Sequence, residues 1–367
     1  MHDPRVKELA DILVNYSTRV KKNDVVLISA SGTACIPLVK EIYTLCLKNG
    51  AKYVEYEFSV PEITRLFFNN ADRKQLSHFP GHKLDFMKQV NVYIGISSGE
   101  NSMVFSQADQ GNMITHSKVM RPITDCRVKN TRWVVTRFPT NGSAQEARMS
   151  LDEYEDYLFS SCCMDWREES RKQDRLKKLM DRTDRVRIKA SDTDLTFSIK
   201  GFKGIKCDGR YNIPDGEVFT APVRESVEGR ITYNCPSMYQ GKEYNGVTLE
   251  FSKGKIVQAS CASSNEDLNR ILDTDEGARY IGEFAIGVNP RIKTPMRNIL
   301  FDEKIFGSIH LTPGQCYDEC DNGNRSAVHW DLVKILTGDG ELWFDDSLIQ
   351  KDGLFVHDSL LELNPGD

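Results

Sequence analysis

In the first half of the chain, strand-like apolar runs alternate with segments whose apolar residues have helical spacing. Apolar or alternating runs predict buried strands at residues 24–30, 52–58, 90–99 and 132–139. Residues 5–20 have the spacing of an amphipathic helix, and residues 36–50 have helical spacing that stops at Gly50, a common helix terminator. Strand, helix and strand in this order predict an α/β fold with a doubly wound parallel sheet.

The pattern changes near residue 185. Residues 151–185 have helical spacing with interleaved acidic and basic side chains, which is typical of a solvated helix that closes a domain. Short alternating runs separated by Gly, Asp and Pro turns then predict antiparallel strands, at residues 185–190, 194–200, 217–222, 229–234 and 247–260. We therefore expect an N-terminal parallel-sheet domain over residues 1–185. A C-terminal α+β domain rich in antiparallel strands would cover residues 186–367.

Length and charge exclude several classes of protein. A chain of 367 residues is too long for one average core, which supports two domains. Its net charge of -5 supplies no basic field for nucleic acid or an anionic membrane. Its apolar runs fall short of the roughly 20 residues that a membrane span needs. The N-terminus carries early acidic residues and no apolar signal core, so we expect a cytoplasmic protein.

Two sequence features have a plain interpretation beside a functional one. The turn SASGTACIP at residues 29–37 has one glycine where a dinucleotide fingerprint needs three, which favours an ordinary strand-to-helix connection. The 10 cysteines are scattered and indicate reduced thiols rather than a disulfide framework. Cys316 and Cys320 form a lone C-x3-C near His310 and His329, which leaves a structural zinc as an alternative.

The segment NRSAVHWDLVKIL at residues 324–336 places an imidazole and a carboxylate in an apolar run. On a strand, His329 and Asp331 share one face while Val328, Trp330 and Leu332 occupy the other. A neutral imidazole beside a carboxylate is a common half of a Zn²⁺, Co²⁺ or Mn²⁺ site. The alternative is a structural pair in which Asp331 accepts a hydrogen bond from His329 at a sheet edge.

Three further residues match this chemistry. His310 lies on the polar face of the strand SIHLT, and Glu283 is the one charged residue in the apolar run YIGEFAIGVNP. Burying a carboxylate is costly, so Glu283 needs a metal ion or an arginine such as Arg279 or Arg291 nearby. Glu217 begins an apolar strand after a Pro-Asp-Gly turn, where an exposed strand-end glutamate is the alternative. Two Glu, two His and one Asp are the donors of a dinuclear metal site that could activate water for amide hydrolysis.

Four motifs occur in one order along the C-terminal half: PDGEVFTAP, GEFAIG, FDEKIFGSIH and N-x-S-A-x-HWD-x-V. Together they closely resemble the aminopeptidase T family of thermophilic metallopeptidases. The resemblance extends to LVNYSTRVKKNDVVLI, MSLDEYEDYLF and DTDLTFSIKG, and so covers most of the chain.

The resemblance implies a cytosolic, metal-dependent aminopeptidase that removes N-terminal residues from peptides and forms a homodimer with active sites facing an enclosed chamber. It implies metal ligands at Glu217, Glu283, His310, His329 and Asp331, holding two divalent ions (Zn, Co or Mn). The family's active-site tyrosine corresponds to Tyr317, whose hydroxyl could bind the tetrahedral oxyanion or a bound water. The alternative for Tyr317 is a loop tyrosine with a packed ring.

The chain also departs from the family pattern. Pro313 replaces a small apolar residue after His310 and is expected to end that strand, since proline cannot donate to a ladder. Asp318 stands where the family has proline, and the segment from His310 to His329 and the N-terminal domain look shorter. These departures bear on the chamber, the substrate pocket and Tyr317 rather than on the ligand types.

The expected mechanism has Glu283 or a neighbouring carboxylate bridging two ions that activate water. The substrate's free α-amino group would bind a metal ion or an acidic side chain. Glu217 and Glu283 are candidates for the general base where metal does not occupy them. Two alternative functions stay open: a non-catalytic relative that binds metal or peptide, and a metal-dependent amidase acting on non-peptide amides.

Overall fold

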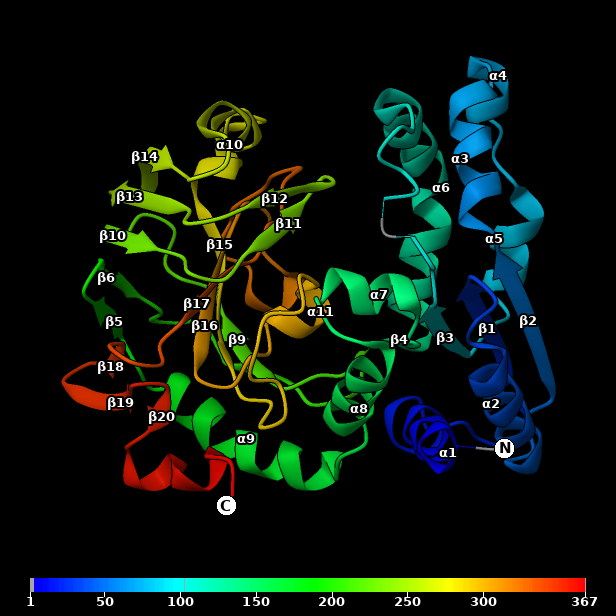
Figure 1. The fold of residues 1–367 in the computed structure, drawn as a ribbon, viewed down its shortest axis with the longest axis horizontal. Helices are drawn as coiled ribbons and strands as arrows, with labels where there is room; N and C mark the ends of the chain where they lie inside the picture. Colours follow the sequence, from blue (N-terminus) through cyan, green and yellow to red (C-terminus); the bar gives the residue numbers. More distant parts are fainter. Residues whose placement is uncertain (1–2, 102, 367) are drawn as a thin grey trace. The chain divides into compact units, whose positions relative to one another are not determined.

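The computed structural model describes residues 3–101 and 103–366. This part of the chain forms two compact units (Figure 1). Unit 1 holds the residues up to Cys163 together with Gly209–Pro214, and unit 2 holds Met164–Asp208 and Asp215–Asp367. The division falls earlier than the domain boundary expected at residue 185. The reason is packing, since Leu176 and Met180 of the charged helix enter the core of unit 2.

Unit 1 is an α/β unit built on a parallel sheet with the strand order β2-β1-β3-β4-β8. Its strands are β1 Val25–Ser31, β2 Tyr53–Ser59, β3 Val92–Ser97, β4 Arg132–Arg137 and β8 Asn212–Ile213. Its helices are α1 Pro4–Asp11, α2 Ile36–Lys48, α3 Pro61–Asn70, α4 Arg73–Leu76, α5 Gly81–Met87, α6 Gln110–Asn130, α7 Asn141–Glu146 and α8 Leu151–Cys162. The prediction of a parallel sheet with helical crossovers is confirmed.

Two helical predictions differ in detail from the structure. The helix expected over residues 5–20 is α1, capped by the Asp3 side chain and followed by a π-helical segment at Ile12–Ser17. The charged segment 151–185 contains two helices, α8 and α9 (Trp166–Met180), because the chain turns at Cys163. The helix α2 ends as expected before Gly50, which has a φ of +80° that a glycine adopts without strain.

Unit 2 is dominated by antiparallel sheets, as predicted. One sheet, here called sheet B, has the order β14-β13-β10-β6-β5-β18-β19-β20, and a second, sheet C, has the order β17-β16-β15-β9-β7. The strands of sheet B are β5 Arg185–Ala190, β6 Thr193–Ser198, β10 Glu228–Thr232, β13 Thr248–Ser252, β14 Lys255–Ser260, β18 Glu341–Phe344, β19 Ser347–Lys351 and β20 Leu354–Phe355. Those of sheet C are β7 Ile205–Cys207, β9 Glu217–Thr220, β15 Ile281–Gly287, β16 Ser308–Pro313 and β17 Leu332–Ile335. Unit 2 also contains the hairpin β11 Ser237–Tyr239 and β12 Lys242–Tyr244 and the helices α9, α10 Asn265–Leu272 and α11 Ile299–Asp302. Three short 3-10 helices complete it, at Glu276–Arg279, Asp318–Cys320 and Asp358–Leu363.

The apolar core of unit 2 packs against one face of sheet C. Phe284 of β15 and Leu311 of β16 belong to the same apolar cluster as Val186 and Leu195 of sheet B. Successive side chains of a strand point to opposite faces. The residues that alternate with these core positions therefore lie on the other face of sheet C, where the predicted metal ligands are found.

After Glu283, the residues of β15 on that other face are small. Ala285 is paired with His310 of β16, and Gly287 is paired with Glu217 of β9. A Cβ atom at Gly287 would lie 2.2 Å from the carbonyl oxygen of Ile305, so only glycine fits there. Small residues on the central strand let the long side chains of its two neighbours meet above it.

We expect Gly287→Ala to lower the free energy of unfolding by about 1–3 kcal/mol, the usual cost of overpacking a filled site. Chemical denaturation followed by tryptophan fluorescence measures this change. Gly81→Ala is the control, because a Cβ there meets no atom within 4 Å. Equal stability of the Gly287→Ala protein and the wild type would contradict the packing described for β15.

Candidate metal centre

Adjacent strands of sheet C bring the five predicted ligands together on one face. Glu217 begins β9, Glu283 lies in β15 and His310 lies in β16. His329 and Asp331 are predicted inside a strand, but they lie directly before β17, where His329 forms an isolated bridge with Gly314. The alternation predicted for this segment is present, since Val328, Trp330 and Leu332 belong to the core.

Glu283 is at the centre of the group. Its Oε1 lies 3.6 Å from Nε2 of His310, and its Oε2 lies 3.6 Å from Nε2 of His329. Nε2 of His310 is also 3.8 Å from Oε2 of Glu217, and Nε2 of His329 is 3.5 Å from Oδ1 of Asp331. The two oxygens of Glu283 thus face two different imidazoles, and each imidazole has a second carboxylate beside it.

The group is buried, and burial changes its acid–base chemistry. Glu283 is 3% exposed and Glu217 is 6% exposed, and burial raises the pKa of both carboxyl groups. Burial works to lower the pKa of His310, but the carboxylates of Glu283 and Glu217 outweigh it and raise that pKa to about 10. For Asp331 the effect of burial is outweighed by His329 and His310, which hold its pKa below the usual value. The carboxylates therefore need positive charge near them.

Neighbouring groups fix the orientation of two ligands. Nδ1 of His329 lies 2.8 Å from the carbonyl oxygen of Gln315. A carbonyl only accepts, so Nδ1 carries the proton and the lone pair of Nε2 faces Glu283 and Asp331. The Thr312 hydroxyl donates to Oδ1 of Asp331 at 2.6 Å. Such outer hydrogen bonds are typical of metal-binding histidines and carboxylates.

The spacing of these donor atoms fits a divalent cation. Two ligand atoms at the usual metal distances on one tetrahedral ion lie about 3.3–3.6 Å apart. The imidazole-to-carboxylate distances given above fall within or just beyond this range. Donor atoms of Glu283, His310 and Asp331 all lie within 4.8 Å of one another. Oε2 of Glu217 and Nδ1 of His310 are buried without a hydrogen-bond partner among the described residues. An ion would satisfy the Glu217 oxygen.

The sequence interpretation missed two charged residues of the motif FDEKIFGSIH. Lys304 is fully buried, with Nζ 4.0 Å from Oε1 of Glu217 and in contact with the carboxylate of Glu303. Burial raises the pKa of Glu303, Lys304 opposes that rise, and nearby Asp331 adds to it. Neither Arg279 nor Arg291 is needed as a cation beside Glu283, since its closest charged partners are the two histidines. An Asp-Glu-Lys run inside an apolar segment was the available signal.

A second cluster of potential ligands shares Glu217. Donor atoms of Cys207, Asp215 and Glu217 lie within 4.8 Å of one another, close to Lys304. Burial raises the pKa of the Cys207 thiol well above its usual value. Here the Lys304 ammonium is the cation that the structure already provides.

The C-x3-C pair has separate partners. The Cys316 thiol donates to the carbonyl of Asn324 at 3.2 Å, and the Cys320 thiol donates to that of Lys203 at 3.0 Å. The cysteines of the described chain are all unpaired.

Tyr317 lies beside the metal-ligand candidates. Its ring centroid is 4.9 Å from that of His329 and 5.4 Å from that of Phe219, and the residue is 45% exposed. The strand β16 ends at Pro313, as its sequence predicted, and Tyr317 directly precedes the short 3-10 helix Asp318–Cys320. The tyrosine is therefore both packed by its ring and open to solvent at the edge of the site.

Buried Glu, His and Asp donors gathered in this way can hold divalent ions, which is the chemistry that metal-dependent hydrolases use. A family model described as thermophilic metalloprotease (M29) matches residues 2–340. The chain belongs to that family, and the predicted resemblance is confirmed. No helix in the described residues is both long enough and apolar enough to cross a membrane.

Relatives and solved structures agree with this family. Aminopeptidase 2 of Geobacillus stearothermophilus is 24% identical over 405 residues, covering 96% of this chain and 95% of the relative. Aminopeptidase T of Thermus thermophilus is 38% identical over 138 residues, a third of each chain (33% and 33%). The structure of wild-type AmpT from Thermus thermophilus has a TM-score of 0.82 at 22% identity, covering 96% of this chain and 99% of that one. The predicted fold class and the enzyme class, a metalloaminopeptidase, are confirmed.

A structure with a different activity shares the fold. The 2,5-dihydroxypyridine dioxygenase of Pseudomonas putida KT2440 has a TM-score of 0.64 at 14% identity, covering 97% of this chain and 98% of that one. Likeness at this identity shows the fold alone, so the donor set and the family carry the functional argument.

We expect Lys304→Met to destabilise the chelator-treated protein by about 3–5 kcal/mol, the usual cost of removing one partner from a buried ion pair. The Glu217 and Glu303 carboxylates would then be buried without their lysine. Lys242→Met is the matched control, because the Lys242 side chain, which pairs with Asp267, is 55% exposed. Such an exposed ion pair is expected to contribute less than about 1 kcal/mol. Equal denaturation midpoints for the two variants would contradict this role of Lys304.

Proposed function

We propose that the protein releases N-terminal residues from peptides at a site that holds two divalent ions. The observation that carries the proposal is the position of Glu283, which presents one oxygen to His310 and the other to His329 at equal distances of 3.6 Å. A carboxylate placed between two imidazoles in this way can bridge two ions.

The ligands divide into two sets around that bridge. Glu217, His310 and Oε1 of Glu283 would hold one ion, and His329, Asp331 and Oε2 of Glu283 would hold the other. Carboxylate and imidazole donors accept Zn²⁺, Co²⁺ and Mn²⁺ alike. When bound, two such ions lower the pKa of a shared water and polarise the scissile carbonyl.

The residues around the ligands supply the remaining chemistry. His329 has 28% of its side chain exposed, whereas Glu283 and His310 are closed off, so substrate would approach from the side of His329 and Tyr317. There the Tyr317 hydroxyl would donate a hydrogen bond to the oxyanion of the tetrahedral intermediate. Glu303 adds a buried carboxylate to Glu217 and Glu283 as candidates for the general base.

An α-amino group is attracted to a site of this charge. The candidate centre contains three carboxylates, and the free amine of a peptide could bind an ion or one of these oxygens. Acetylation removes the charge and the lone pair of that amine. An aminopeptidase should therefore cleave peptides with a free N-terminus and spare acetylated ones. An amidase does not need the free amine, and a binding protein cleaves neither kind of peptide.

We expect the chelator-treated protein to hydrolyse short peptides only after Zn²⁺, Co²⁺ or Mn²⁺ is restored, with activity saturating near two ions per chain. Peptides with acetylated N-termini should be cleaved at least 100-fold more slowly, and amino-acid analysis of the released residues measures both rates. Equal cleavage of free and acetylated peptides would favour the amidase, and metal uptake without cleavage would favour the binding protein.

We expect Glu283→Gln to lower the bound metal from two ions per chain to one or none, since an amide cannot bridge as a carboxylate does. Tyr317→Phe is the contrasting variant, because it should keep both ions and lose activity by about 100-fold, the usual effect of one oxyanion donor. Elemental analysis of the dialysed proteins gives the metal content beside the rate. If Glu283→Gln keeps full metal and full hydrolysis, the assignment of Glu283 is wrong.

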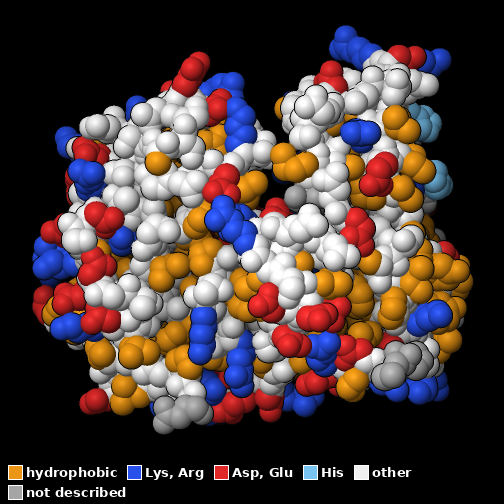
Figure 2. Space-filling view, viewed as in Figure 1, with side chains coloured by type: hydrophobic (Ala, Val, Ile, Leu, Met, Phe, Trp, Pro, Cys, Tyr) orange, Lys and Arg blue, Asp and Glu red, His pale blue; other side chains and the backbone are white. Residues whose placement is uncertain are grey.

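For the homodimer implied by the family resemblance, we propose an association surface in unit 1. Strand β2 is at the edge of its sheet and exposes Tyr53 and Tyr56, and α3 exposes Ile63 and Leu66 at 64% and 55%. Figure 2 shows hydrophobic side chains gathered on the side of this view where Figure 1 has β2. Exposed apolar patches on an edge strand are typical of association surfaces.

We expect the protein to have twice the chain mass of 41.7 kDa in light scattering after gel filtration. Replacing both Ile63 and Leu66 by Glu should give the monomer mass at the same loading concentration. Val257→Glu is the control, since Val257 is equally exposed (59%) in unit 2. A dimer that survives the double replacement would exclude this surface.

We also propose that the protein works in the cytoplasm. Its unpaired cysteines are typical of a reducing compartment. Recovery of the native protein mainly in a membrane or extracellular fraction would contradict this location.

A further inference from the structure

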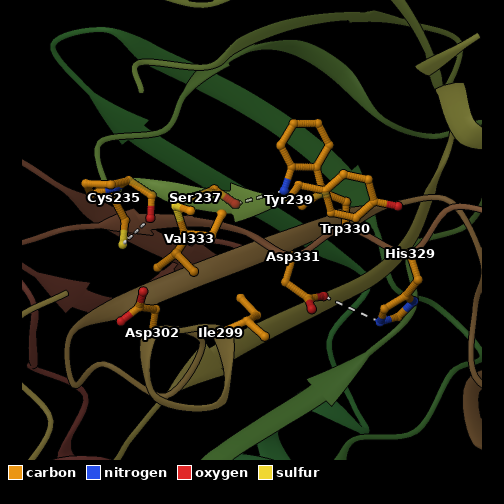
Figure 3. Close-up of a pocket in the computed structure, with 11 residues that line it drawn as sticks. Cys235, Ser237, Tyr239, Ile299, Asp302, His329, Trp330, Asp331 and Val333 are labelled. Atoms are coloured by element: carbon orange, nitrogen blue, oxygen red, sulfur yellow. Dashed lines mark hydrogen bonds and ion pairs between the residues drawn. The ribbon is translucent and has the colours of Figure 1, made fainter. Parts of the chain in front are cut away.

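A pocket opens directly beside the candidate metal ligands (Figure 3). His329 and Asp331 form one end of it, Cys235, Ser237 and Tyr239 form one wall, and Ile299 and Asp302 of α11 face them. Its volume is about 160 Å³. An apolar cavity of about 150 Å³ is large enough for a benzene ring, so this pocket suits one amino-acid side chain.

The aromatic part of the pocket is held in place by packing. The Trp330 ring stacks on that of Tyr239 at 4.7 Å and 22°, and its Nε1 donates to Oγ of Ser237 at 2.8 Å. Tyr244 also packs edge-on against the indole, with ring centroids 4.9 Å apart. The polar groups of Trp330 and Ser237 therefore satisfy each other, and the wall presents a fixed apolar surface.

Two buried uncharged side chains, with Asp302 close to them, line the inner end of the pocket. Val333 and Cys235 are buried there, and burial raises the pKa of the Cys235 thiol so that it stays protonated. Ile299 is 41% exposed and marks the rim that opens to solvent.

Asp302 is the one acidic lining residue apart from Asp331, and its oxygens are already engaged. Oδ1 accepts from the backbone N–H of Met296 at 2.6 Å, and Oδ2 accepts from that of Asn298 at 3.0 Å. The residue is 2% exposed. Its carboxylate thus lines the pocket with both oxygens already bound to backbone N–H groups, which makes it a weaker partner for a basic side chain than an unbound carboxylate.

We propose that this pocket receives the side chain of the substrate's N-terminal residue and selects apolar residues of the size of leucine or methionine. The inference rests on the proposed aminopeptidase function, because it takes the scissile carbonyl to lie at His329 and Asp331. The side chain of the residue whose carbonyl is attacked would then extend along the pocket toward Val333. Its burial against Tyr239, Val333 and Ile299 supplies the selectivity.

The test compares kcat/KM of the metal-loaded enzyme for Leu-, Ala- and Lys-p-nitroanilide. One buried methylene changes discrimination by about 10-fold or more, so we expect leucine to exceed alanine by at least 10-fold and lysine to fall below leucine. Ile299→Trp narrows the rim and should reduce the leucine-to-alanine ratio at least threefold. Leu361→Trp, at a residue that is 50% exposed elsewhere in unit 2, should leave that ratio unchanged.

Calorimetric titration with free leucine and free alanine separates this inference from the proposed function. Leucine should bind the metal-loaded protein at least 10-fold more tightly than alanine, and Ile299→Trp should reduce that difference. Equal binding of the two amino acids, equal turnover of their anilides, or a preference for lysine would overturn the pocket assignment. If no anilide is hydrolysed while leucine still binds selectively, the proposed peptidase function fails, and only the pocket's selectivity for a leucine side chain stands.

Discussion

Buried negative charge on one face of sheet C is the constraint on which the rest of unit 2 depends. Glu217, Glu283 and Asp331 are held away from bulk water, and isolated carboxylates at such a depth are strongly unfavourable. The chain meets this cost in two ways. Lys304 provides a permanent cation beside Glu217, and the two imidazoles present nitrogen atoms at distances from the carboxylate oxygens that match those of ligands sharing a metal ion. Metal binding and the stability of the sheet are therefore expected to be linked.

The sheet makes this charge density possible through its two faces. Phe284, Leu311 and Leu332 bury one side of sheet C against sheet B, while the alternating positions carry the ligands. Along β15 those positions step from Glu283 to the small residues Ala285 and Gly287. Side chains from β9 and β16 reach each other across that gap, so packing on the core face and chemistry on the other face follow from the same period of two.

The same alternation explains how much could be predicted from the sequence. Strand periodicity correctly placed His329 and Asp331 on one face, His310 on a polar face and Glu283 within a buried strand. It could not show that β9, β15 and β16 are neighbours, because the order of strands in a sheet depends on long-range pairing. The family resemblance supplied that convergence. The sequence did not reveal the roles of Lys304 and Glu303, because Glu217, the ligand beside Lys304, is distant in sequence. It did not reveal the pocket, because residues 235–239 and 299–302 come together only in the folded unit.

Fold and chemistry are separable in this architecture, since a dioxygenase shares the fold with a TM-score of 0.64. Function therefore depends on the ions that the donor set holds, and anomalous X-ray diffraction from crystals saturated with Zn²⁺ or Co²⁺ tests this most directly. The account predicts two anomalous peaks about 3.5–4 Å apart. One would lie between Glu217, His310 and Glu283, and the other between His329, Asp331 and Glu283. A single peak would contradict the bridging role of Glu283, and the absence of any peak at these residues would contradict the metal centre itself.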